Sequence, residues 1–230
     1  MKASVVIPAH NEEKNIADTI RAVLAQDYPD FEVIVVDNAS TDHTAEVVKA
    51  FKSVKLVHEP KKGLLSARER GRKEAIGEII INMDADCLPL PSHISNGMKH
   101  FDKKRIVAVT GPYDYHDGHP IFRHSSLALQ RYVYHPVSVI LQMPFLKKGA
   151  VLIGGNNFIR ADILNKVGGY DTSIVFYGED TNTAKRVAPH GKVVFDKRLS
   201  MKTSARRFKE EGSVRITIKY LFHFWKTILS

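Results

Sequence analysis

Short apolar runs, rich in β-branched residues, alternate with longer amphipathic segments through the first half of the chain. The runs lie at residues 4–8, 31–37, 55–58, 79–83 and 106–110. Because they mostly lack polar alternation, they predict strands of a parallel sheet that is buried on both faces. The segments between them place apolar residues at helical spacing. The alternation therefore predicts an α/β fold, with a mostly parallel, doubly wound sheet and helices on both faces.

The helices of this half have recognisable start signals. Asn11 is expected to cap the first helix, because its side chain can accept from the free N–H groups of a first turn. Asp42 is expected to start the second helix, which should end near Phe51. Two further helices are expected over residues 65–75 and 91–101.

The second half is less regular. Residues 132–146 carry no formal charge apart from His135, and Pro136 and Pro144 should break them. The stretch is too apolar for a free surface loop, and two interpretations stay open: a helix packed on the core, or an apolar lip for an acceptor or a membrane surface. An extended segment at 151–160 contains a glycine pair, which indicates that a ligand approaches the backbone closely.

The last segment is predicted to be an amphipathic helix. Its apolar stripe comprises Val214, Ile218, Leu221, Phe222, Trp225, Ile228 and Leu229. A neighbouring basic stripe comprises Arg215, Lys219, His223 and Lys226. Such a helix either lies in a membrane interface or packs its apolar stripe onto the protein's own core, and the sequence leaves both open.

Length and charge narrow the classes of partner. The 230 residues contain no Pro/Gly/Ser-rich linker, which favours one large domain. The net charge of +9 is uneven, because nine Lys and Arg residues face two acids from Lys197 to the end. Such a patch could meet nucleic acid, anionic lipid headgroups or a substrate diphosphate. The basic end has no motif that reads nucleic acid, so we expect no nucleic-acid partner.

Cysteine usage and hydropathy indicate the compartment. The single cysteine, Cys87, excludes an intramolecular disulfide and gives no sign of an oxidising compartment or of a Cys-based zinc site. No charged segment followed by an apolar one opens the chain, and no stretch reaches the roughly 20 apolar residues of a spanning helix. We expect a cytoplasmic protein, with peripheral contact to the inner face of the membrane as an open possibility.

Two carboxylates stand where the fourth apolar run stops. Asp84 and Asp86 fall at the carboxyl end of this strand, where ligands of open α/β sheets bind. The two like charges repel each other and need a cation, and hard oxygen ligands suit Mg²⁺ or Mn²⁺ carrying a substrate phosphate. A strand end with solvated aspartates is the simpler interpretation of the triplet.

Other charged groups also stand at the ends of elements. Asp37 ends the second strand, and Arg68 lies early in the third helix, beside the same edge. Arg206 and Arg207 place two guanidinium groups side by side, which suits bidentate contact with a diphosphate.

Adjacent acids open a helix late in the chain, at Glu179 and Asp180. The helix dipole favours acids in a first turn, so capping is a sufficient role for Glu179. Asp180 could act as a general base.

Five short motifs, in this order, resemble those of family 2 glycosyltransferases, a large inverting family of GT-A fold. They lie at residues 6–13, 35–42, 63–71, 84–86, and 168–171 with 178–180. The resemblance covers residues 3–207. It implies a GT-A domain at 1–207, with a nucleotide-sugar-binding half at 1–112 and an irregular acceptor-side half at 113–207. Residues 208–230 would form a basic amphipathic C-terminal segment.

The resemblance implies an inverting transferase that moves a sugar from a UDP- or GDP-sugar to a hydroxyl of a saccharide or lipid-linked acceptor, in cell-surface polysaccharide or glycolipid synthesis. The nucleotide would be bound by Pro8, Ala9, Glu12, Asp37 and Arg68. The divalent cation, Mg²⁺ or Mn²⁺, would be held by Asp86 and, less directly, by Asp84. The acceptor hydroxyl would be deprotonated by Asp180, supported by Glu179.

This chemistry is physically coherent. A metal with Arg206 and Arg207 would neutralise the leaving diphosphate, and a carboxylate must reach the acceptor on the opposite face. Two departures from the family stand out. The family often has a histidine that could bind the metal in the region of residues 201–204, and this chain has none there. The chain also lacks a Gln-x-x-Arg-Trp run, which argues against a processive polymer synthase.

Other functions fit less well. A nucleotidyltransferase that makes sugar nucleotides shares the sheet and the metal aspartates, but it usually has a Gly-rich basic loop where Pro8 and Ala9 stand. The first strand is followed by neither a dinucleotide-binding glycine motif nor a P-loop. A non-catalytic carbohydrate- or membrane-binding module would not need Asp84, Asp86 and Asp180 together.

Overall fold

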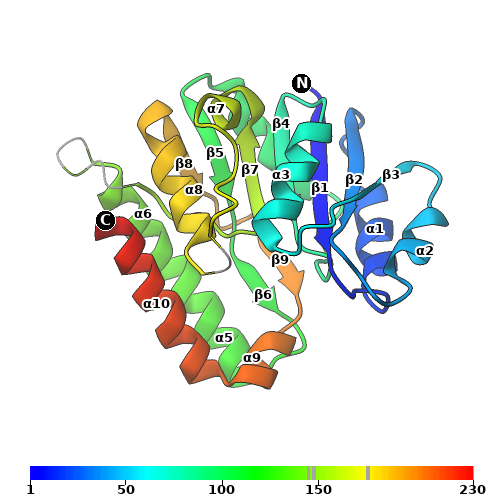
Figure 1. Ribbon diagram of the computed structural model, residues 1–230. Coiled ribbons are helices and arrows are strands. Elements are labelled where there is room, and N and C mark those ends of the chain that lie inside the picture. Colours follow the sequence, from blue (N-terminus) through cyan, green and yellow to red (C-terminus); the bar gives the residue numbers. More distant parts are fainter. Residues whose placement is uncertain (144–145, 147–148, 175–176, 230) are drawn as a thin grey trace.

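A central sheet organises the computed structural model, which describes residues 1–143, 146, 149–174 and 177–229. Within these residues the sheet has seven strands in the order β3-β2-β1-β4-β7-β5-β8. The strands are β1 Ala3–Ala9, β2 Phe31–Asp37, β3 Val54–His58, β4 Ile79–Met83, β5 Ile106–Thr110, β7 Asn156–Arg160 and β8 Lys192–Phe195. Only β7 runs antiparallel to its neighbours among them. The mostly parallel sheet expected from the apolar runs is confirmed (Figure 1).

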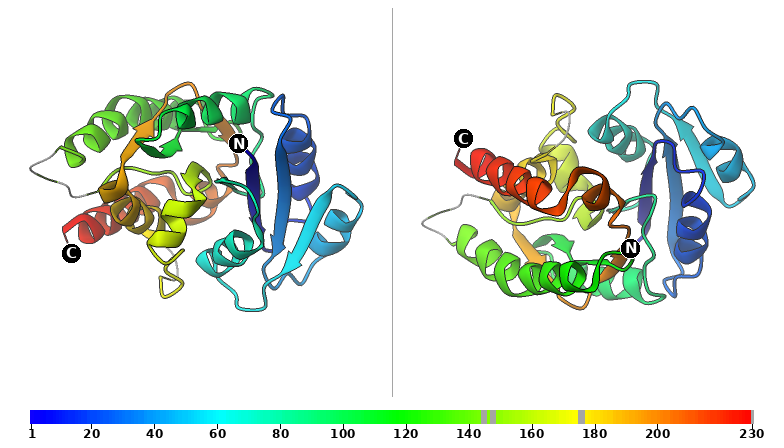
Figure 2. Two further views of the ribbon diagram at one scale, coloured as in Figure 1. Left: turned by 90° about the horizontal axis from the view of Figure 1, so that it is seen from above. Right: turned by 90° about the horizontal axis from the view of Figure 1, so that it is seen from below.

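Helices cover both faces of this sheet (Figure 2). On one face the core includes side chains of α1 Ile16–Leu24, α2 Thr44–Lys49 and α4 His93–Met98. On the other face it includes side chains of α3 Leu64–Glu74, α7 Ala161–Lys166 and α8 Glu179–Val187. Both faces of β1 and β4 are therefore buried, and this explains why their sequences are apolar apart from Ser4 and Asn82.

The second half of the chain adds a small second sheet and a long helical run. β6 Tyr113–Tyr115 pairs in parallel with β9 Met201–Thr203. The helical run comprises α5 Pro120–Leu129, a π-helical turn η2 Gln130–Tyr134 and α6 His135–Leu141. The remaining elements are the 3-10 turns η1 Lys99–Asp102 and η3 Ala188–His190, and the helices α9 Arg206–Glu211 and α10 Ser213–Leu229.

Three local expectations are wrong. Asn11 does not cap α1: its φ is 56°, and the helix begins only after Asn15. The second helix is shorter than expected, since α2 ends at Lys49. Pro136 does not break the helical run, because it lies in the first turn of α6, where a missing N–H is tolerated. Pro144 lies outside the described residues.

The C-terminal segment packs against the domain. α10 contacts α8 and α9, and it buries Ile216 and Ile228. Aromatic rings pack between α9, α5 and β6. The ring centroid of Phe208 of α9 lies 4.8 Å from that of Phe122 of α5 and 5.0 Å from that of Tyr115 of β6. Most of the apolar stripe of α10 nevertheless stays exposed, so of the two interpretations left open, packing of the stripe onto the core accounts only for Ile228.

Candidate active site

The carboxyl ends of β1, β2 and β4 form one edge of the sheet. The parallel register pairs Ala9 with Asp37, and it pairs β1 with β4 on the other side. Asp84 directly follows β4. Asp37 and Asp84 therefore leave the sheet at the same edge, on either side of β1, as expected for parallel neighbours.

Asp37 has one bonded and one free oxygen. Its Oδ2 lies 3.0 Å from Nδ1 of His58, which ends β3. Its Oδ1 is buried and has no hydrogen-bond partner among the described residues. A buried acceptor without a partner is costly, so a ligand that donates an N–H at this point would remove that cost.

Asp84 is held by two side chains from distant parts of the chain. Arg68 of α3 donates from Nη2 to Oδ1 at 3.1 Å, and the Tyr113 hydroxyl of β6 donates to Oδ2 at 2.7 Å. Burial and the charge of Asp84 raise the pKa of Tyr113 well above its usual value, so this phenol keeps its proton. Both oxygens of Asp84 are therefore bonded within the protein.

The glycine pair of residues 151–160 makes room for this cluster. A Cβ at Gly155 would lie 2.1 Å from the Asp84 carboxylate and 2.3 Å from the Tyr113 hydroxyl. A Cβ at Gly154 would lie 3.1 Å from the guanidinium of Arg68. Close approach to the backbone was expected here, but the approaching groups are the protein's own side chains.

The substitution Gly155→Ala is expected to displace Asp84, because a 2.1 Å contact is sterically impossible. If Asp84 supports metal and donor binding, the loss should be about 10- to 100-fold in donor affinity, as for other residues that orient metal ligands. Calorimetric titration with a sugar nucleotide measures it. Gly154→Ala is the matched control, since its Cβ would meet only the end of the Arg68 side chain at 3.1 Å. Equal affinities for the two variants would contradict the role of Asp84.

Asp86 faces a polar cavity. Thr203 of β9 donates to its Oδ1 at 3.1 Å. The cavity has a volume of about 190 Å³ and is lined by Asn15, Asp18, Thr19, Asp86, Leu88, His116, Asp117 and Ser204. Burial, and then the charges of Asp84 and Glu12, raise the pKa of Asp86 to about 7. The hydrogen bond from Thr203 and the charge of Arg206 oppose only part of this rise in the pKa.

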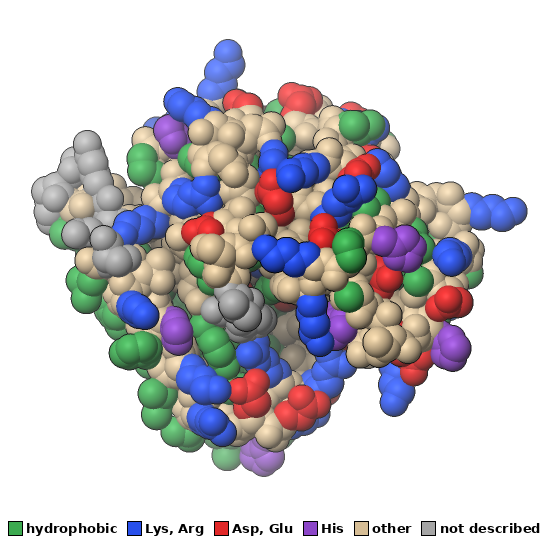
Figure 3. Space-filling model, viewed as in Figure 1, with side chains coloured by type: hydrophobic (Ala, Val, Ile, Leu, Met, Phe, Trp, Pro, Cys, Tyr) green, Lys and Arg blue, Asp and Glu red, His purple; other side chains and the backbone are tan. Residues whose placement is uncertain are grey.

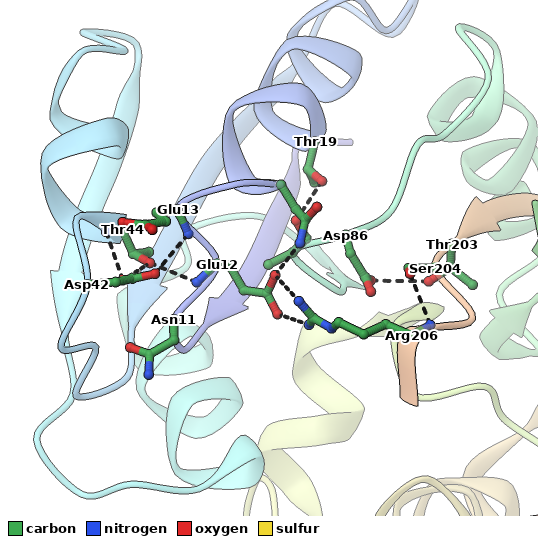
Figure 4. A network of polar contacts seen from close by, with 12 residues as sticks. Asn11, Glu12, Glu13, Thr19, Asp42, Thr44, Asp86, Thr203, Ser204 and Arg206 are labelled. Atoms are coloured by element: carbon green, nitrogen blue, oxygen red, sulfur yellow. Dashed lines mark hydrogen bonds and ion pairs between the residues drawn. The ribbon is translucent and has the colours of Figure 1, made fainter. Parts of the chain in front are cut away.

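An ion pair from the C-terminal part of the chain crosses beside Asp86 (Figure 4). Arg206 of α9 lies with its Nη2 2.5 Å from Oε1 of Glu12, 194 positions away in sequence. Arg207 points elsewhere: it donates to the Tyr177 hydroxyl at 3.1 Å and pairs with Glu211 at 3.0 Å. The two guanidinium groups, adjacent in sequence, are therefore not together in space.

Glu179 and Asp180 open α8, as expected. Gly178 precedes them with φ 84°, a backbone conformation that favours glycine. The Thr181 N–H donates to Oδ1 of Asp180 at 2.7 Å. Glu179 is 6% exposed, and its Oε2 has no partner within the described ranges. Burial, and then the charge of Glu179, raise the pKa of Asp180 to about 7.

Arg68 links the two groups of acids. Its side chain is 3% exposed, and burial opposes its charge. Asp84 and Glu179 make the two largest contributions against burial, and the pKa of Arg68 is raised overall. In return, Arg68 partly opposes the rise in the pKa of Asp180. The hydrogen bond of Arg68 goes to Asp84, and its expected place near the base and ribose stays a prediction.

The turn at Gly168–Asp171 anchors this arrangement. The Tyr170 hydroxyl lies 2.7 Å from Nδ2 of Asn82 in β4, and the Tyr170 N–H donates to Glu69 of α3 at 3.0 Å. A Cβ at Gly169 would lie 2.4 Å from Glu69. This motif was singled out for the acceptor side, and the structure gives it a role in joining α3 to β4.

Sequence reasoning missed Tyr113 and His116. Nδ1 of His116 lies 3.0 Å from the Thr203 carbonyl oxygen, and the ring lines the cavity at Asp86. A histidine thus reaches the region of residues 201–204, but from the loop after β6. Their position in the sequence could have indicated a role in the site, because both residues closely follow the carboxyl end of β5, where ligands bind in such sheets.

Comparison with known proteins shows which family this chain belongs to. A family profile described as Glycosyl transferase family 2 matches residues 4–168. The chain belongs to glycosyltransferase family 2. Among curated family members, glycosyltransferase AglE of Haloferax volcanii is 28% identical over 195 residues, which are 82% of this chain and 62% of AglE.

Solved structures share the GT-A fold. The mannosyltransferase PcManGT from Pyrobaculum calidifontis, in complex with GDP-Man and Mn²⁺, has a TM-score of 0.78 and 24% identity, covering 100% of this chain and 64% of the other. Glucosyl-3-phosphoglycerate synthase from Mycobacterium tuberculosis, in complex with Mn²⁺, UDP-glucose and phosphoglyceric acid, has a TM-score of 0.66 and 20% identity, covering 99% and 79%. The chain thus spans less than two thirds of AglE and PcManGT.

Proposed function

We propose that this glycosyltransferase is an inverting enzyme. It moves a sugar from a UDP- or GDP-linked donor to a hydroxyl of a saccharide or lipid-linked acceptor, in the synthesis of cell-surface polysaccharide or glycolipid. The observation that carries the proposal is the position of Arg68, whose charge is stabilised by both Asp84 and Glu179. The metal motif and the acids of α8 therefore belong to one electrostatic cluster.

In this proposal the nucleotide binds at the carboxyl ends of β1 and β2. Pro8 and Ala9 end β1 beside Asp37, and the free Oδ1 of Asp37 would accept an N–H of uracil or guanine. Arg206 would exchange its contact with Glu12 for a diphosphate oxygen, since guanidinium groups match phosphate geometry. Arg207 would act more remotely, because Tyr177 and Glu211 already bind it.

The residues at Asp86 fit a divalent cation. Asp86 borders the cavity, and its raised pKa reflects burial and like charges that a cation would offset. Asp84 would support the site from behind, because Arg68 and Tyr113 occupy its oxygens. Within the described part of the chain, no group of three or more His, Cys, Asp and Glu side chains is arranged to hold an ion. Donor oxygens and water would supply further ligands, and the bound Mg²⁺ or Mn²⁺ would neutralise the leaving diphosphate.

Asp180 would take the proton of the acceptor hydroxyl. Its raised pKa makes it a better proton acceptor than an ordinary aspartate near neutral pH. Glu179 would support the base by raising the pKa of Asp180, and the charge of Arg68 would limit that rise. Attack on the face opposite the diphosphate then inverts the anomeric carbon in one displacement.

Calorimetric titration with a panel of UDP- and GDP-sugars, with and without Mn²⁺, tests the proposal. We expect at least one donor to bind measurably only when Mn²⁺ is present. The absence of binding by every nucleotide sugar, with Mn²⁺ present, would contradict the assignment of the donor pocket.

The pH dependence of turnover follows from Asp180. The base must be deprotonated, and its pKa is raised to about 7, so kcat should rise with pH up to about 7 and level off above it. Below pH 7 we expect a loss of about tenfold per pH unit. The measurement is kcat at saturating donor and Mn²⁺ between about pH 5 and 9, because saturation removes the effect of Asp86 on binding. A flat profile down to about pH 5 would indicate an unperturbed carboxylate and contradict the assignment.

A further inference from the structure

The outer face of α10 is apolar, basic and exposed. We call it the α10 ridge, and it comprises Val214, Arg215, Ile218, Leu221, Phe222, Trp225, Lys226 and Leu229. Its six apolar side chains are between 46% and 75% exposed. α10 contains no Asp or Glu. The helix is held to the domain by its other face, where Ile216 and Ile228 are buried.

A second ridge of the same character lies on the helical run from α5 to α6. We call it the α5–α6 ridge, and its exposed apolar side chains are Ile121, Leu129, Tyr132, Val133, Val139 and Ile140. Residues 120–141 contain no Asp or Glu and two arginines, Arg131 and Arg123, of which Arg123 pairs with Asp114 of β6. Monomeric soluble proteins rarely expose contiguous apolar faces of this kind without a partner.

The two ridges lie on the same side of the molecule. In Figure 1 both α10 and the run from α5 to α6 follow the lower left side, and Figure 2 shows that they lie at different depths. Hydrophobic side chains line the lower left margin of the space-filling view in Figure 3. A flat surface approaching from this side would meet the helices that carry both ridges.

We propose that the α10 ridge and the α5–α6 ridge together dock in the interface of an anionic lipid bilayer. Apolar side chains flanked by Lys and Arg, with a Trp among them, match acyl chains below negative headgroups. A second copy of this chain fits less well. A two-fold interface brings the same patch of each copy together, and here it would set basic groups against basic groups with no acid on either ridge.

This docking places the bilayer next to the helix that carries Asp180. α10 packs against α8, and Tyr220 of α10 lies close enough to Asp180 and Glu179 that their charges help to raise its pKa. Among the described residues, no helix combines the length and hydropathy that a membrane crossing requires. The proposed contact is peripheral, on the leaflet that carries the anionic lipids.

Trp225 reports on the contact directly, because it is the only tryptophan of the chain and belongs to the α10 ridge. The full chain is titrated with vesicles of phosphatidylglycerol mixed with phosphatidylcholine, and with vesicles of phosphatidylcholine alone. We expect a blue shift of Trp225 emission and co-sedimentation with the anionic vesicles, both weakened by salt. No shift and no co-sedimentation would overturn the proposal. Dimerisation without vesicle binding would also overturn it and assign the ridges to a second copy.

Variants separate the two ridges from general surface effects. Arg215→Gln with Lys226→Gln should weaken binding to anionic vesicles about thirtyfold, from the contribution of each basic residue near the surface. Phe222→Ser or Tyr132→Ser should weaken it at least about tenfold. Ile76→Ser is the matched control, because Ile76 is 70% exposed but lies before β4, outside both ridges. An equal loss in the control, or unchanged binding of Tyr132→Ser, would contradict the docking of both ridges.

Discussion

Replacing Asp180 with Asn is expected to lower kcat by about 100- to 10,000-fold, because an amide cannot take the proton of the acceptor hydroxyl. Donor affinity should stay unchanged, since the diphosphate and the nucleotide are assigned to other residues. Steady-state kinetics of transfer and calorimetry of donor binding measure the two effects separately.

Asp162→Asn provides a matched control for this variant. Asp162 is the second residue of α7, as Asp180 is of α8, and each Oδ1 accepts the N–H of the next residue, at 2.8 Å and 2.7 Å. The control therefore removes the same negative charge from the first turn of a helix, at a position outside the cluster, while the amide oxygen of Asn can still accept the local hydrogen bond. If Asp180→Asn keeps wild-type turnover, or if both variants lose it equally, Asp180 is not the base.

Replacing Asp86 with Asn should abolish donor binding that depends on Mn²⁺. Changes to groups that only orient metal ligands already lower metal affinity by about 10- to 100-fold, and the loss of the ligand itself should cost at least as much. The measurement is calorimetry with the donor found in the panel, with and without Mn²⁺.

Asp18→Asn controls for changes in the cavity at Asp86. Asp18 lines the same cavity, but its side chain is 70% exposed and pairs with Arg21 at 2.7 Å. We expect nearly wild-type affinity for this variant. Metal-dependent binding that survives in Asp86→Asn would show that the cation is held by other groups.

The fold was predictable because the buried strands are recognisable in the sequence as apolar runs. The run at residues 79–83 has apolar side chains on both sides of the strand and one polar residue, Asn82, and the structure buries all five of its residues. The position of Asp84 and Asp86 followed from the same run, since a charged residue cannot continue a strand buried on both faces. Helix boundaries were less predictable. Asn11 has the side chain of a cap, but its backbone takes a left-handed turn and its side chain accepts from Thr41 instead.

The partners of the candidate site residues were not predictable, because they come from elements far apart in sequence. No local pattern indicates that Tyr113 binds Asp84, or that Arg206 and Arg207 turn to different partners. Similarly, the glycine pair at 154–155 indicated a close approach but not which group approaches. The stripe of α10 was visible in the sequence, but which of its residues face the domain depends on α8.

The configuration of the sugar released from the donor tests the central claim most directly. In this account Asp180 activates an oxygen nucleophile on the face of the sugar opposite the diphosphate. The slow hydrolysis of the donor should therefore release a sugar of inverted anomeric configuration, observed by proton NMR before mutarotation. Inversion that disappears together with hydrolysis in Asp180→Asn is the predicted result. A product that retains the configuration of the donor would contradict a single displacement assisted by Asp180.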